Sequence, residues 1–176
     1  MEKPSSYCAF VATLDENNLH KIYHDTQYGF SIQDDNELFG RLILEINQAG
    51  LSWITILKKQ NSFRLAYDNF NIQKIANYTQ TDIDRLLRNE GIIRNRLKIN
   101  AAIYNAQAIL KLKKEYKSFK NWLDSQPKME LKDWVKLFKK HFKFVGGEIT
   151  NEFLMSTGYL PGSHIQECPI YKKINH

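Results

Sequence analysis

Two cysteines and two histidines have the side chain types that bind a metal ion. Cys8 and His24 lie near the start of the chain, and His164 and Cys168 lie near its end in an H-x3-C arrangement. Two thiolates and two imidazoles make an ordinary tetrahedral zinc set. The Cys-x15-His spacing is no known zinc-finger pattern, and a disulfide is not expected in a reducing cytosol. Spacing therefore leaves two alternatives open, which are free thiols or a metal that fastens the two ends together.

A carboxylate, Glu45, is a second candidate for chemistry. Leu38, Leu42, Glu45 and Ala49 are spaced so that they share one face of a helix. A buried carboxylate is unfavourable unless it is paired or hydrogen-bonded. Glu45 therefore either reaches water at the edge of the apolar stripe or lies in a pocket that takes a cationic or donor-rich ligand.

Three aromatic residues could form the walls of such a pocket. Tyr23, Trp53 and Phe10 have rings that stack on a flat ligand. The same rings would serve equally well in a core, so their types do not decide between these roles.

The stretch FKFVGG, between two helical patterns, could contact a phosphate backbone. It consists of Phe142, Lys143, Phe144, Val145, Gly146 and Gly147. Its two glycines would permit a tight turn and expose backbone N–H groups beside a helix N-terminus, where an anion can bind without any reading of sequence. The alternative is an ordinary connection between two helices.

Basic residues are concentrated in one part of the chain. Residues 94–143 hold fourteen Lys and Arg and four acids, a formal charge of +10, whereas the whole chain carries +6. A segregated positive region favours a polyanionic partner, and nucleic acid first. A solvated, lysine-rich helix face would explain the same pattern.

The elements that must position these residues are expected to be helices. Apolar periodicity and capping residues predict helices over 37–49, 53–60, 71–77, 79–91, 96–116, 131–142 and 147–158. Alternating strand patterns are nearly absent. We therefore expect a compact all-α protein with a single domain over residues 1–176. Without an apolar run of membrane length or a signal-peptide pattern, we expect a monomer in the cytosol that does not bind a membrane.

Five blocks of sequence, in this order, resemble the DNA-3-methyladenine glycosylase I family. They are YHD at 23–25, LEINQAGLSWITILKK at 44–59, GIIRNRLKI at 91–99, FKFVGG at 142–147 and H-x3-C at 164–168. The match runs from about residue 7 to about residue 172, and QAGLSW with a preceding Glu is highly specific.

The resemblance implies a helix-hairpin-helix base-excision repair enzyme. Such an enzyme flips 3-methyladenine out of alkylated double-stranded DNA, hydrolyses its N-glycosidic bond and releases free 3-methyladenine. The resemblance places one structural zinc per chain on Cys8, His24, His164 and Cys168. It places the base pocket on Tyr23, Glu45 and Trp53, with Phe10 as a further candidate wall, and the DNA-gripping hairpin on residues 142–147. Glu45 would then hydrogen-bond the edge of the flipped base.

The chain departs from the family pattern at several positions. Phe10 stands where the family usually has Trp, and residues 27–29 read QYG instead of EWG. Residues 59–60 read KQ instead of KR, and Ser163 is a variant without a carboxylate. These departures affect the shape of the pocket and leave Glu45 and the Cys/His set intact.

Other catalytic groups are hard to find in the sequence. Many helix-hairpin-helix glycosylases carry an Asp shortly after the hairpin, but no Asp follows Asp133. Glu148 and Glu152 are interpreted as surface or helix-start charges. No lysine stands out as the nucleophile of a lyase, so we expect a monofunctional glycosylase. The alternative is a catalytically impaired protein of the same fold that binds DNA or damaged bases without cleaving.

Overall fold

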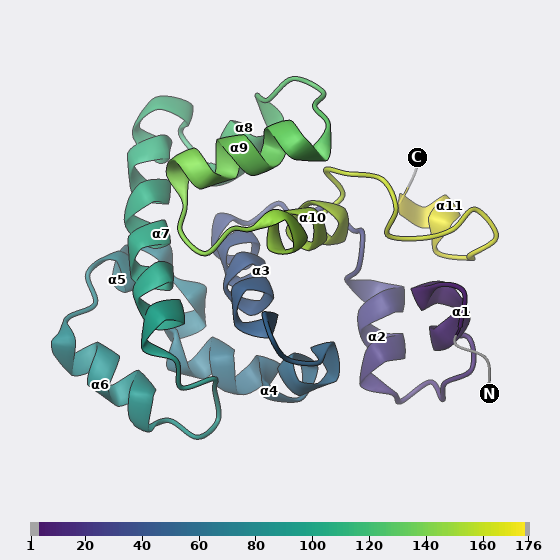
Figure 1. The fold of residues 1–176 in the computed structure, drawn as a ribbon, viewed down its shortest axis with the longest axis horizontal. Coiled ribbons are helices and arrows are strands. Elements are labelled where there is room, and N and C mark those ends of the chain that lie inside the picture. The colour runs from purple at the N-terminus through teal and green to yellow at the C-terminus, as the bar shows by residue number, and fades with distance from the viewer. Residues whose placement is uncertain (1–3, 175–176) are drawn as a thin grey trace.

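The computed structural model describes residues 4–174, and all regular structure in this range is helical (Figure 1). The helices are α1 (Tyr7–Val11), α2 (Leu19–Thr26), α3 (Asp35–Gln48), α4 (Trp53–Ala66), the 3-10 helix η1 (Asp68–Phe70), α5 (Ile72–Ala76), α6 (Gln80–Arg88), α7 (Arg96–Tyr116), α8 (Phe119–Asp124), α9 (Leu131–His141), α10 (Gly147–Ser156) and α11 (Tyr171–Ile174). The all-α prediction is confirmed. Within the described range, no helix has the length and apolar character needed to cross a membrane.

Helices α3 and α6 begin at expected capping residues, whereas α6 ends at Arg88, before the expected stop at Gly91, and α4 continues to Ala66, beyond the expected residue 60. The Asp34 side chain accepts a hydrogen bond from the Glu37 backbone N–H at 3.0 Å, which starts α3. After α3, Gly50 adopts a φ of +82°, a conformation that favours glycine. Thr79 and Asp82 form a reciprocal capping box at the start of α6. Helices α1, α2, α8 and α11 were not expected, because each is too short to show a clear apolar period.

Helix α3 lies at the centre of the molecule and packs against α4, α7, α8 and α10 (Figure 1). Ten consecutive residues, 38–47, are buried, so other parts of the protein cover every face of this part of the helix. A polar side chain in this stretch must therefore find a partner inside the protein or face a cavity.

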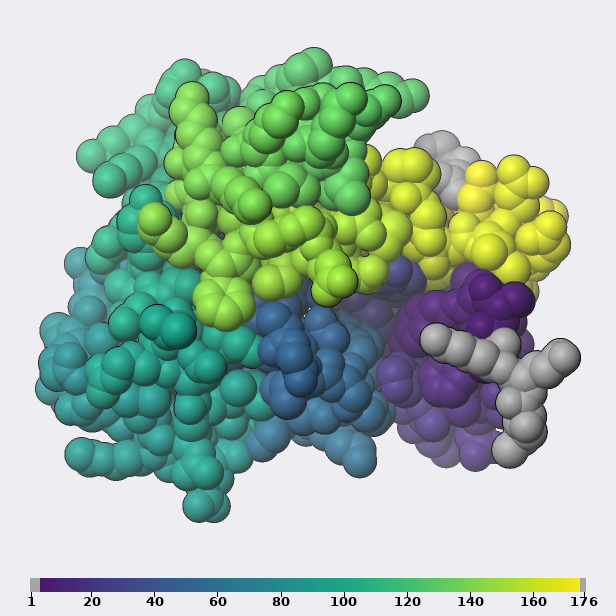
Figure 2. Space-filling view, viewed as in Figure 1, coloured from purple at the N-terminus to yellow at the C-terminus, as the bar shows by residue number. Residues whose placement is uncertain are grey.

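The two ends of the described chain meet on one side of the molecule. Helices α1 and α2 lie beside α11, and the space-filling view shows the first and last segments, purple and yellow, in contact (Figures 1 and 2). Cys8, Cys168 and Ile170 form a small buried cluster at this junction. The fold thus brings together the two pairs of metal-binding side chain types that the sequence holds far apart.

Candidate active site

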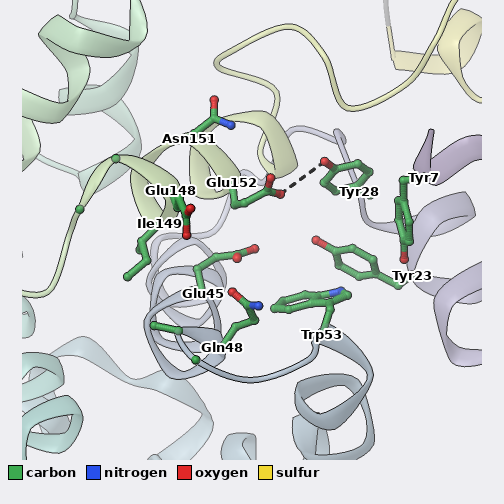
Figure 3. Close-up of a pocket in the computed structure, with 14 residues that line it drawn as sticks. Tyr7, Tyr23, Tyr28, Glu45, Gln48, Trp53, Glu148, Ile149, Asn151 and Glu152 are labelled. Atoms are coloured by element: carbon green, nitrogen blue, oxygen red, sulfur yellow. Dashed lines mark hydrogen bonds between the residues drawn. The ribbon is translucent and has the colours of Figure 1, made fainter. Parts of the chain in front are cut away.

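A pocket of about 840 Å³ opens between α3, α10 and the N-terminal helices (Figure 3). Such a volume suits a small aromatic ligand. Its walls come from α1 and α2, the end of α3, the start of α4 and the start of α10. The lining residues are Tyr7, Tyr23, Tyr28, Glu45, Gln48, Ala49, Gly50, Trp53, Gly146, Gly147, Glu148, Ile149, Asn151 and Glu152.

Glu45 is the buried carboxylate of this pocket. Its side chain projects from α3 toward the aromatic wall, and only 4% of the residue is exposed (Figure 3). Among the described residues, none forms a hydrogen bond with this carboxylate. Burial raises the pKa of Glu45 to about 8; Arg41 opposes this shift, and Glu152 adds to it. A buried acceptor without a protein partner, facing a cavity, is available to a ligand.

Arg41 supplies positive charge one helical turn before Glu45. Its Nη1 donates to the Tyr23 hydroxyl at 3.2 Å and to the Ser156 carbonyl at 3.3 Å. The guanidinium is buried, and no carboxylate of the described chain lies within ion-pair distance of it. Sequence reasoning missed Arg41, although its position four residues before Glu45 was a usable signal.

Aromatic rings form one side of the pocket. The rings of Tyr23 and Trp53 are 5.1 Å apart between centroids, and Tyr28 lies 5.6 Å from Tyr23. Tyr23 and Trp53 were predicted, whereas Tyr7 and Tyr28 were missed. Phe10 is not among the lining residues; its ring stacks behind Tyr7 at 6.3 Å, so the expectation that Phe10 forms a wall is wrong.

Of the two α10 glutamates interpreted as surface or helix-start charges, Glu148 is the exposed first-turn charge that was expected, whereas Glu152 reaches into the pocket. Glu152 is half-buried, accepts a hydrogen bond from the Tyr28 hydroxyl at 3.4 Å and points into the same space as Glu45 (Figure 3). Burial raises the pKa of Glu152. Glu148 is exposed and lies at the rim. No local pattern separates Glu152 from a solvated helix charge, because its hydrogen-bond partner Tyr28 is 124 positions away.

One lysine does stand out from the surface set, which corrects the expectation that none would. Lys98 is 5% exposed, and its Nζ donates to the carbonyl oxygens of Asn47 at 2.9 Å and Ala49 at 2.8 Å. Burial lowers its pKa. The ammonium closes the last turn of α3 and is not among the groups that line the pocket, so its position gives no support to a lyase nucleophile.

The four predicted metal ligands come together and are all buried. The ligand atoms of Cys8, His24, His164 and Cys168 lie within 4.8 Å of one another. The Cys168 Sγ is 3.5 Å from the His164 Nδ1 and 3.8 Å from the His24 Nε2. Ligands held about 2.0 to 2.3 Å from a tetrahedral ion would be about 3.3 to 3.8 Å apart. The set therefore fits a metal ion.

The outer nitrogen of each histidine in this cluster has a partner. The His24 Nδ1 lies 2.6 Å from an Asp25 carboxylate oxygen, and the His164 Nε2 lies 2.7 Å from the Tyr28 carbonyl oxygen. These contacts fix both rings and leave the other ring nitrogen facing the thiols. Metal-binding histidines commonly make such outer contacts.

The candidate hairpin, residues 142–147, joins α9 to α10. Phe142 and Val145 anchor it in the core, while Lys143 and Phe144 are exposed. The residue with a left-handed backbone is Phe144, with a φ of 61°, so the expectation that the two glycines make the turn is wrong.

A buried asparagine fixes the backbone of this hairpin. The Asn105 Nδ2 donates to the Lys143 carbonyl at 3.1 Å, and the Lys143 N–H donates to the Asn105 Oδ1 at 2.7 Å. The two bonds position the residue directly before the left-handed Phe144. Sequence reasoning missed Asn105, since a fully buried polar residue in the middle of a long helix has no local signature.

Comparison with known proteins agrees with this geometry. The model of the family described as Methyladenine glycosylase matches residues 13–135. The chain belongs to this family. It is 36% identical over 173 residues to the DNA-3-methyladenine glycosylase of Haemophilus influenzae, covering 88% of this chain and 93% of the relative. It is 33% identical over 183 residues to DNA-3-methyladenine glycosylase 1 of Escherichia coli, covering 93% and 96% of the two chains.

Solved structures of this family have the same fold. The 3-methyladenine DNA glycosylase I of Staphylococcus aureus superimposes with a TM-score of 0.81 at 31% identity, over 95% of this chain and 97% of that chain. A variant of 3-methyladenine DNA glycosylase I in complex with 3-methyladenine superimposes with a TM-score of 0.81 at 32% identity, over 93% and 96%.

Proposed function

We propose that this protein is a base-excision repair glycosylase that removes 3-methyladenine from alkylated double-stranded DNA. The observation that carries the proposal is Glu45, a buried acceptor that no described residue hydrogen-bonds and that faces aromatic rings in a pocket beside the hairpin. Membership of the family supports the same conclusion.

The target base must leave the duplex to reach this pocket. A flipped, methylated adenine would stack against the rings of Trp53 and Tyr23 and present its amino edge to Glu45. Cation–π attraction favours the positively charged ring of the N3-methylated nucleotide. A damaged base pair also costs less to open, which adds selectivity.

The reaction itself demands little acid catalysis. The bond between C1′ of the deoxyribose and N9 of the purine breaks, and its electron pair neutralises the positive ring. Water then adds to C1′ and loses a proton, leaving an abasic sugar and free 3-methyladenine. The methylated purine is already a good leaving group, so positioning and charge stabilisation are the contributions left to the protein.

The hairpin is proposed to bind the DNA backbone. A Cβ added to Gly146 or Gly147 would meet no other atom within 4 Å, and neither residue has a positive φ. Nothing inside the protein therefore requires glycine here. An outside partner that approaches the backbone closely, such as a phosphate at the N-terminus of α10, would require it.

We infer that the Cys/His cluster binds one structural zinc ion. Two thiolates and two imidazoles suit zinc, and four buried protein ligands leave no open position for substrate. When bound, the metal would join the two ends of the chain, and the proposed chemistry does not involve it.

The deciding experiment is release of free base. Duplex DNA treated with a methylating agent is incubated with the purified protein, and the released bases are separated by chromatography. Free 3-methyladenine is expected, with undamaged duplex as the control. Tight DNA binding without any released base would instead identify a catalytically impaired protein of the same fold.

A further inference from the structure

A second carboxylate faces the base pocket in addition to Glu45. Glu152 lies on α10 and is half-buried, and its side chain points toward the same space as that of Glu45 (Figure 3). The Glu152 charge disfavours ionisation of Glu45, and Glu148 at the rim of the pocket disfavours ionisation of Glu152. The pocket thus has acidic side chains on two of its walls, α3 and α10.

The polar surroundings of Glu152 do not neutralise its charge. Its one printed partner is the Tyr28 hydroxyl, which donates at 3.4 Å and carries no positive charge. No lysine or arginine in the part of the chain that the structure describes lies within ion-pair distance of Glu152. The buried cations near the pocket are bonded elsewhere: Arg41 donates to Tyr23 and Ser156, and Lys98 donates to the carbonyl oxygens of Asn47 and Ala49.

Two carboxylates that share a half-buried site repel one another, and this repulsion disfavours ionisation of both. A positively charged ligand between them removes the repulsion and favours the ionised form of each. A neutral ligand of the same shape gives no such gain. The arrangement therefore favours binding of a positively charged ligand. This preference is separate from the hydrogen bonds that recognise an adenine edge.

We propose that Glu152 is a specificity-determining residue that makes the pocket select cationic bases over neutral ones. The inference rests on the proposed function and deepens it, because it names the substrate class as N-alkylated purines whose glycosidic bond leaves the ring positively charged. After bond cleavage the electron pair returns to the ring and the free base is neutral. Glu152 then no longer attracts the base, which favours release of the product.

The test compares two free ligands of nearly the same shape. Free 3-methyladenine has no substituent at N9 and is neutral near pH 7.5. Adenine methylated at both N3 and N9 carries a fixed positive charge. Dissociation constants for both are measured with the wild-type protein and with Glu152→Gln. The amide keeps the size of the side chain and a group that can contact Tyr28, but it removes the charge.

We expect Glu152→Gln to weaken binding of the cation by roughly tenfold, as for loss of one nearby charge in a half-buried site. Binding of the neutral base should change by less than about twofold, because its hydrogen bonds and stacking are retained. Single-turnover excision of 3-methyladenine from DNA, where the base is cationic, should fall in parallel with binding of the cation.

Two further variants keep the result interpretable. Glu16→Gln makes the same charge change on the exposed loop between α1 and α2, outside the pocket and outside the basic region 94–143, and should behave as the wild type. Glu152→Asp keeps the charge and should retain most of the preference for the cation. Equal loss of both ligands in Glu152→Gln would overturn the inference, because it would indicate a structural role, and so would unchanged binding of both.

The failure of the inference and that of the proposed function are distinguishable. If wild-type protein releases 3-methyladenine from methylated DNA and Glu152→Gln does so at the same rate, the glycosylase assignment stands and the role of Glu152 is overturned. If wild-type protein releases no base, the proposed function falls, and the inference that rests on it falls too.

Discussion

Glu45 is the buried carboxylate of the pocket that we propose binds the base. Its helical stripe and the resemblance to a glycosylase family were enough to single it out from the sequence. Glu152 was not predictable, because its hydrogen-bond partner Tyr28 comes from the turn after α2, far away in the sequence. A carboxylate inside an apolar stripe can be recognised from the local sequence as a candidate site residue. The role of a carboxylate near the polar start of a helix depends on its tertiary contacts.

We expect Glu45→Gln to lower single-turnover excision of 3-methyladenine by roughly tenfold to a hundredfold. The amide keeps the volume but offers donors where the amino edge of adenine needs an acceptor, and a lost hydrogen bond in a dry site costs about 1 to 3 kcal/mol. Binding to undamaged duplex, measured alongside, should barely change. Unchanged excision would mean that Glu45, although buried in the pocket, does not recognise the base.

The same substitution should change how stability depends on pH. The pKa of Glu45 is raised to about 8 in the folded protein, whereas a carboxyl in an unfolded chain titrates near about 4.3. The folded state therefore holds this proton more tightly, and the resulting stability is fully present below about pH 4 and lost as the pH rises toward about 8.

Glu45→Gln cannot ionise and should escape this loss. We expect its free energy of unfolding at pH 8 to exceed that of the wild type by on the order of 2 to 4 kcal/mol. The difference should shrink toward pH 5. Urea unfolding at both pH values measures this difference. The charged and titratable groups around position 45, which are Arg41, Glu152, Tyr23 and Tyr28, are the same in both proteins, so the comparison isolates the Glu45 carboxyl. A difference that is independent of pH would contradict the assigned direction of the shift.

Two departures from the family pattern touch each other. The Gln60 Nε2 donates to the Gln27 Oε1 at 3.2 Å, and the Arg41 Nη2 lies 3.5 Å from the same oxygen. An amide pair thus stands where the family pattern places an acid and a base. Gln27 carries no charge, so among the described residues no carboxylate forms an ion pair with Arg41, and the Arg41 charge opposes the rise in the pKa of Glu45.

At the scale of the elements, the position of the hairpin was predictable from the sequence, but the contacts that shape it were not. FKFVGG was correctly placed between two helices, since the apolar periods on both sides were clear. The residue that turns the chain is Phe144, and the side chain that clamps the hairpin is Asn105. Neither was predictable, because both depend on contacts between α7 and the hairpin.

We expect the double variant Gly146→Ala, Gly147→Ala to bind undamaged duplex DNA more weakly by roughly tenfold. The added methyl groups enter open space in the free protein, so the free energy of unfolding should change by less than about 1 kcal/mol. Fluorescence anisotropy with labelled duplex and urea unfolding check the two parts. Unchanged DNA binding would remove the argument that these glycines make room for a phosphate.

At the scale of the whole molecule, DNA binding should be mostly electrostatic. Residues 94–143 carry a formal charge of +10, and the lysines of α9 that lead to the hairpin are exposed. Phosphates attract lysines irrespective of base sequence, so affinity for undamaged duplex should fall steeply as salt rises and depend little on sequence. Titrations between about 50 and 200 mM salt measure this slope. A flat salt dependence would contradict the proposed role of the basic region.

Metal content tests the proposed zinc site, where the two ends of the described chain meet. We expect one zinc per chain in protein purified without chelators, and a lower thermal unfolding midpoint after its removal. Cys168→Ser should lose the metal and destabilise the fold without altering residues of the base pocket. Elemental analysis and calorimetry check both statements. Metal-free protein of unchanged stability would contradict the zinc assignment.

The all-α class followed from periodicity alone, but the closure of the molecule did not. No local spacing indicates that Cys8 and His164 meet, because 156 positions separate them. Only the family resemblance joined the two pairs before the structure did. Long-range closure of this kind is set by the packing of every helix in between.

This closure also has a consequence for synthesis of the protein. A ribosome completes Cys8 and His24 well before His164 exists, a delay of about 8 to 30 s at ordinary elongation rates. During that interval Cys8 and His24 cannot meet His164 and Cys168. A chain that stops before residue 164 never contains these last two residues. The Cys/His cluster can therefore form only after the hairpin and α10 have been translated. A truncated product would lack the complete cluster, and we expect it to be more sensitive to proteolysis.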